Sequence, residues 1–157
     1  MHLSQNAFFT NLAVVAAEDD GEPAEPIILM LRERLPSMGW ATGQWYPDHG
    51  SAVADFINNG EEVMVKVALV ADDRWWIQVC DASMPGVIGR ILGQKRSASA
   101  AAMYALSSLI HDTLLEEYRP AEYGWCWDDS PDGPGLHERP PVPTAPDDTP
   151  LGTRKCS

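Results

Sequence analysis

Cysteine is scarce in this chain, and its spacing suits neither a metal site nor a disulfide framework. The 157 residues include three cysteines, which are far apart at Cys80, Cys126 and Cys156. Structural zinc sites need closely spaced ligands, and small disulfide-stabilised domains need paired cysteines. The sequence therefore indicates a reducing compartment, and we predict no metal and no other cofactor.

Long apolar runs are also missing. A membrane-spanning helix needs about 18 or more consecutive apolar residues, and the chain has no such stretch. A short apolar run at residues 13–17 has no Lys or Arg before it, whereas a secretory signal needs a basic segment there. We therefore expect a soluble cytoplasmic protein with no membrane partner.

Basic residues are few. Acids outnumber bases 23 to 11, which gives a formal net charge of −12. Such a field repels nucleic acids and attracts basic proteins. The sequence thus predicts a basic protein as the partner and makes nucleic acid an improbable ligand. A homodimer is an alternative that the sequence leaves open.

Two segments have the apolar spacing of amphipathic helices. In residues 25–35, apolar side chains recur every three or four positions, and Pro36 and Gly39 mark the end. The second helix is predicted at about 99–117, with Ser97 or Ser99 as its N-cap, and Pro120 stops it.

Strands are predicted between these helices from alternating apolar residues. The alternation is clear at 63–69 and 75–79, and residues 53–57 read as a further strand. The sequence Asn58-Asn59-Gly60 favours a hairpin, because Asn and Gly tolerate positive φ. Residues 44–46 could add a fourth strand at the edge.

These elements indicate an α+β fold, with a three- to four-stranded antiparallel meander and two main helices packed on one face. Residues 1–24 are predicted to be an N-terminal arm or short helix (4–17) followed by an acidic linker. The globular domain is expected at 25–130. Residues 131–157 are proline-rich and aperiodic, so they are predicted to be a disordered tail.

Basic residues gather just before the second predicted helix, at Arg90, Lys95 and Arg96. A helix N-terminus adds positive potential, so this segment is a candidate anion-binding site. The order of one helix, three strands and one helix over 25–117 resembles double-stranded RNA-binding domains, which implies RNA binding at this helix entry. That family carries several lysines here, whereas this chain has mostly Ser and Ala.

Tryptophan is abundant, with six in the chain. Trp76 should point away from the sheet face of Trp75, so it is a candidate contact residue. Trp125 and Trp127 form either an aromatic contact surface or a short strand packed back on the domain. The candidate partner-binding residues are Trp76, Trp125 and Trp127 with the acids Asp72, Asp73, Glu18, Asp19 and Asp20.

The predicted function is non-catalytic binding of a basic protein. The size and acidity are similar to those of bacterial immunity proteins, antitoxins and secretion chaperones. The alternative is an anion- or RNA-binding module that uses residues 90–96. A third hypothesis is a small enzyme with an unrecognised site. A Cys–His–Asp set could be drawn from Cys80 or Cys126, His49 or His111, and Asp48 or Asp112.

Overall fold

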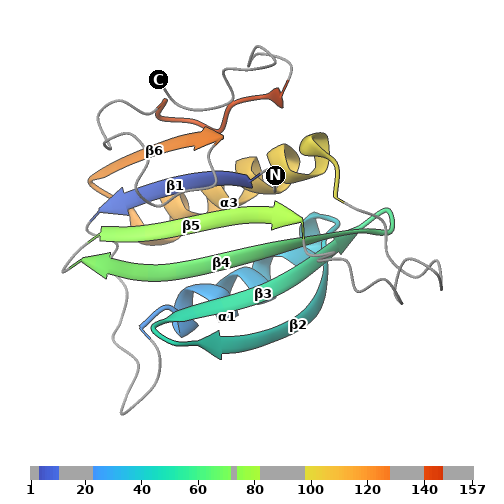
Figure 1. The fold of residues 1–157 in the computed structure, drawn as a ribbon, viewed down its shortest axis with the longest axis horizontal. Coiled ribbons are helices and arrows are strands. Elements are labelled where there is room, and N and C mark those ends of the chain that lie inside the picture. The colour runs from blue at the N-terminus through green and yellow to red at the C-terminus, as the bar shows by residue number, and fades with distance from the viewer. Residues whose placement is uncertain (1–3, 11–22, 72–73, 82–97, 128–139, 147–157) are drawn as a thin grey trace.

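A computed structural model of the chain describes its fold. The structure describes residues 4–10, 23–71, 74–81, 98–127 and 140–146. These residues form one antiparallel sheet with two α-helices (Figure 1). The α+β class predicted from the sequence is therefore confirmed.

The sheet has six strands in the described part of the chain, in the order β2-β3-β4-β5-β1-β6. Every neighbouring pair is antiparallel. The strands are β1 Ser4–Thr10, β2 Ala41–Asp48, β3 Ser51–Asn58, β4 Glu61–Ala71, β5 Arg74–Asp81 and β6 Glu122–Trp127. The predicted meander corresponds to β2–β5, but the expected count of three to four strands was wrong because β1 and β6 extend it.

The N-terminal segment is the main correction to the prediction. Residues 4–17 were expected to form a helix or an arm, whereas Ser4–Thr10 is a strand between β5 and β6. All seven of its residues are buried, including Gln5 and Asn6, which are 0% exposed. Because this strand is covered on both faces and carries polar residues on each, it lacks the alternation that marks a half-buried strand.

Two tight hairpins fix the register of the meander. Asn59 and Gly60 both have positive φ, at 51° and 79°, which is the geometry of a type I′ turn. This confirms the predicted hairpin. His49 and Gly50, with φ of 40° and 88°, make the same kind of turn between β2 and β3.

The helices are α1 Glu25–Arg34, which continues into the 3₁₀ turn η1 Leu35–Met38, and α3 Ala100–Tyr118. Both lie on the same face of the sheet, behind it in Figure 1. Their buried side chains join those of the strands in one core. The predicted placement of both helices on one face is thus confirmed.

Four strands, β2–β5, separate α1 from α3, so the three-strand order of double-stranded RNA-binding domains is not found.

The N-cap of α3 is Ser99, which was one of the two candidates predicted from the sequence. Its hydroxyl accepts a hydrogen bond from the backbone N–H of Ala102 at 3.1 Å.

We expect Ser99→Ala to lower the free energy of unfolding by ~0.5–2 kcal/mol, since this N–H loses its acceptor. Urea unfolding monitored by circular dichroism measures the change. Ser108→Ala, inside the same helix, is the matched control and should have almost no effect; an equal loss in both variants would contradict the cap.

The two outer edges of the sheet differ. At the β6 edge, the N–H of Trp125 donates to the carbonyl of Pro140 at 2.8 Å, and the indole N–H of Trp127 donates to the carbonyl of Thr144 at 2.8 Å. Residues 140–146 therefore pack against the sheet, although the sequence placed them in a disordered tail. The rest of the predicted tail lies outside the described residues.

At the other edge, β2 is mostly exposed and has a bulge between Thr42 and Trp45. The guanidinium of Arg32 donates to the carbonyl of Gly43 within this bulge. Bulges and prolines such as Pro47 are features that protect edge strands from pairing with other chains.

None of the helices in the described ranges is both long enough and apolar enough to cross a membrane.

Candidate functional site

Trp76 lies on the sheet face opposite to the helices, but it is buried. Its side chain packs with Phe8 and Ala68, apart from the main core, and the residue is 8% exposed. The guanidinium of Arg74 lies 5.5 Å from the centre of the Phe8 ring. The sequence therefore placed Trp76 on the correct face. In the free chain, however, its indole is not displayed as a surface anchor.

Trp125 and Trp127 are buried as well, at 0% and 3% exposure. Both belong to β6 and pack in the main core under α3. The sequence left two interpretations of this segment open, and the structure has the short packed strand. An aromatic contact surface would require β6 to leave the sheet.

The other predicted site residues lie outside the described residues. They are the acids Glu18, Asp19, Asp20, Asp72 and Asp73, and the basic residues Arg90, Lys95 and Arg96. Their roles in partner binding or anion binding stay predictions.

A group of exposed charges that the sequence analysis did not single out lies around the C-terminal end of α3. Asp112, Glu116, Glu117 and Glu122 are all exposed there. We call these four carboxylates the acidic helix end. Arg119, the C-cap residue, lies among them with a left-handed φ of 46°.

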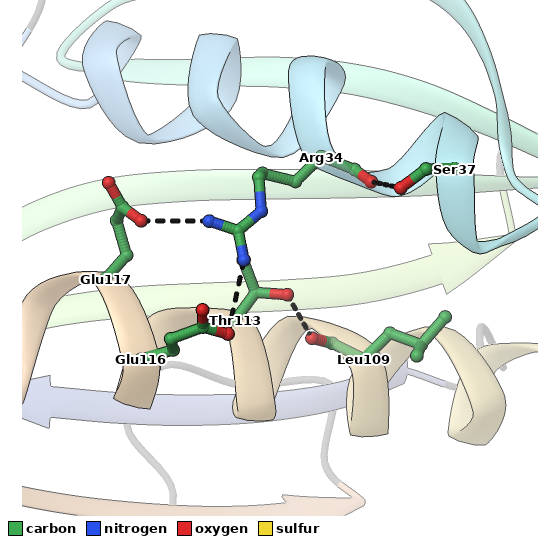
Figure 2. A network of polar contacts seen from close by, with 6 residues as sticks. All are labelled: Arg34, Ser37, Leu109, Thr113, Glu116 and Glu117. Atoms are coloured by element: carbon green, nitrogen blue, oxygen red, sulfur yellow. Dashed lines mark hydrogen bonds and ion pairs between the residues drawn. The ribbon is translucent and has the colours of Figure 1, made fainter.

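Arg34 from α1 crosses to this surface. One of its guanidinium nitrogens lies 3.2 Å from a carboxylate oxygen of Glu116, and the other lies 3.0 Å from Glu117 (Figure 2). The Glu116 and Glu117 side chains remain 71% and 42% exposed. Exposed ion pairs of this kind contribute only ~0–1 kcal/mol each. Arg34 therefore offsets one of the two negative charges but holds the carboxylates only weakly.

The sequence did contain a signal for this surface. The last turn of α3 carries no basic residue, although cations are favoured at a helix C-terminus by the helix dipole. Asp112 and Glu116 are also four positions apart, a spacing at which like charges repel. Departures from local rules of this kind are expected at functional sites. The cross-helix contact with Arg34 could not be read from the sequence, since 82 positions separate it from Glu116.

The thiol of Cys80 is not set up as a nucleophile. Burial, followed by the nearby charges of Asp81 and Asp55, raises its pKa to about 12. With this pKa the thiol is protonated at neutral pH. Because only the thiolate is nucleophilic, Cys80 is not reactive there. His111 packs in the helix-side core beside Trp125, whereas strand alternation puts Cys80 and Cys126 on the opposite face. The structure thus does not bring these cysteines together with His111.

His111 is buried against the strands, at 5% exposure. Its Nδ1 accepts a hydrogen bond from the indole N–H of Trp125 at 3.1 Å. Burial lowers the pKa of the imidazole, and the charge of Asp112 acts in the opposite direction but is the smaller effect. The arrangement therefore favours a neutral ring with its proton on Nε2.

Within the described residues, no group of three or more His, Cys, Asp or Glu side chains is placed to hold a metal ion. A scan against protein-family models and a search of curated proteins gave no match for this chain.

Proposed function

We propose that this chain is an acidic protein-binding module that takes a basic protein as its partner, with the acidic helix end as part of the contact surface. The observation that carries the proposal is the group of exposed carboxylates around the end of α3, of which Glu116 and Glu117 lie in the last turn, where the helix dipole disfavours them. A surface that gives up local stability in this way is suited to binding cations from outside.

The overall charge supports the same proposal. A net charge of −12 speeds the encounter with a basic protein and slows the encounter with an acidic one. Glu116 and Glu117 remain 71% and 42% exposed beside Arg34, so a partner's Lys or Arg can reach both carboxylates.

The buried tryptophans limit how the partner can be held. Trp76, Trp125 and Trp127 are each at most 8% exposed, so a partner that docks on the folded chain meets charges first. We therefore expect binding that is strongly dependent on salt. Trp76 could contact a partner only if the residues that cover it, such as Phe8, moved. Its buried indole N–H has no acceptor among the described residues and could then donate to the partner.

The experiment compares two variants that remove the same charge from different places. Partners are first captured from the native host on the immobilised chain, and association rates are then measured at low and high salt. We expect Glu116→Gln with Glu117→Gln to slow association at low salt by roughly twofold to tenfold, and to weaken its salt dependence.

Glu25→Gln with Glu33→Gln on α1 is the matched control, because it also removes two negative charges. Equal slowing in both pairs would mean that only the net charge matters and that the acidic helix end is not the contact surface. A partner that is itself acidic, or one lost only when Arg90, Lys95 and Arg96 are replaced, would instead favour the anion-binding alternative.

A further inference from the structure

His111 joins α3 to the outermost part of the sheet. Its ring lies 6.2 Å from the Trp125 ring and 5.3 Å from the Tyr123 ring, both on β6, and 6.5 Å from the Phe9 ring on β1. The Trp125–His111 contact is a direct side-chain hydrogen bond between α3 and β6. The imidazole is thus the meeting point of the helix with the strand at this edge.

The hydrogen bond fixes which nitrogen can carry the proton. An indole N–H can only donate, so Nδ1 of His111 must be unprotonated to accept from it. A second proton on the ring would place an N–H at Nδ1 against the N–H of Trp125. The bond would break, and a charged imidazolium would remain among three aromatic rings.

The groups around the ring do not compensate this charge fully. From α3, the carboxylate of Asp112 favours the protonated form. From β6, Tyr123 and Trp125 present aromatic rings, and from β1, Phe9 does the same. Burial outweighs the Asp112 charge, so the pKa of His111 is lowered.

The strand held by this contact is the last one of the described sheet, and it also buries Trp125 and Trp127 in the core. β6 pairs only with β1 in the described sheet. Its outer side holds residues 140–146 through Trp125 and Trp127. If Trp125 moves away from α3, β6 and residues 140–146 therefore move away from the sheet together. The meander β2–β5 is held by its own pairing.

We propose that the His111–Trp125 hydrogen bond is a proton-sensitive latch, which at neutral pH holds β6 and residues 140–146 on the sheet and in acid lets this edge open while the meander stays paired. The free edge of β1 is then available to another strand.

The direction follows from linkage. A folded-state pKa below the ordinary value of about 6.5 means that the open form takes up a proton that the closed form excludes. The closed edge is therefore fully stable above about pH 6.5 and is lost progressively as the pH falls through the folded pKa.

The test is hydrogen exchange of the full chain between pH 7 and pH 5, corrected for intrinsic exchange rates. We expect protection of residues 122–127 to fall by roughly tenfold or more across this range, and that of β3 and β4 to change much less. His111→Asn should abolish the difference, since the amide oxygen can accept from Trp125 but does not titrate. His49→Asn, in the exposed hairpin, is the matched control and should behave as the wild type.

A second measurement keeps the test decisive if His111→Asn does not fold. In the wild type, the NMR signal of the Trp125 indole N–H should move with the same pH midpoint as the ring protons of His111. An indole signal that stays fixed while His111 titrates would overturn the proposal. So would an equal loss of protection in wild type and His111→Asn.

Discussion

Phe9→Ala is expected to lower the free energy of unfolding by ~3–5 kcal/mol, through lost burial and the cavity left behind. Phe9 is 0% exposed in β1, an interior strand next to the β6 edge. Its ring stacks on Tyr123 at 5.8 Å between centroids and meets Trp125 edge-on at 5.8 Å. Removing the ring therefore empties the middle of the aromatic cluster under α3. Chemical denaturation measures the loss.

Tyr46→Ala is the matched control for this prediction. Tyr46 is also an aromatic residue on a strand, but it is 47% exposed, so its loss should cost under ~1 kcal/mol. If the two variants were equally stable, residues 4–10 would not form an interior strand of the sheet, and the expectation of a loosely docked arm would regain support.

Leu106→Ala is the second large effect, with an expected cost of ~2–4 kcal/mol. Leu106 is 0% exposed on the face of α3 that packs on the sheet. Alanine is the better helix former, so the loss comes from packing and not from helix propensity. Thermal or urea unfolding of the full chain gives the difference.

Leu29→Ala makes the same chemical change on an exposed position. Leu29 is 40% exposed on α1, and its replacement should change stability by less than ~0.5 kcal/mol. A similar cost at both leucines would mean that α1 is covered on its outer side in solution, for example by a second copy of the chain.

The predictable part of the fold is the part whose sequence alternates cleanly. β4 has Val63, Val65 and Val67 on the core side, each 0% exposed, and this regular pattern suffices to identify a strand. Gln5 and Asn6 are equally buried in β1, but polar residues give no such pattern. Their burial depends on neighbours that come from β5 and β6, which no local window of sequence includes.

The candidate site was less predictable for a related reason. Strand alternation correctly put Trp76 opposite to Trp75, but alternation does not say whether a face is covered. Sequence distance hides the other contacts: the carboxylate of Glu117 and the guanidinium of Arg34 are 83 positions apart. Only the folding of α3 beside α1 makes them neighbours.

The position of the first strand between β5 and β6 also sets the order in which the chain can be assembled. Ser4–Thr10 leaves the ribosome before its partners, since it pairs with residues 74–80 on one side and residues 122–127 on the other. Pairings between such distant segments form slowly, because a long loop must close first. Phe8 and Phe9 therefore stay unpaired at least until residues 74–80 have been added, and one edge of their strand stays open until residue 127 has been added. During this time chaperones can bind the two exposed phenylalanines.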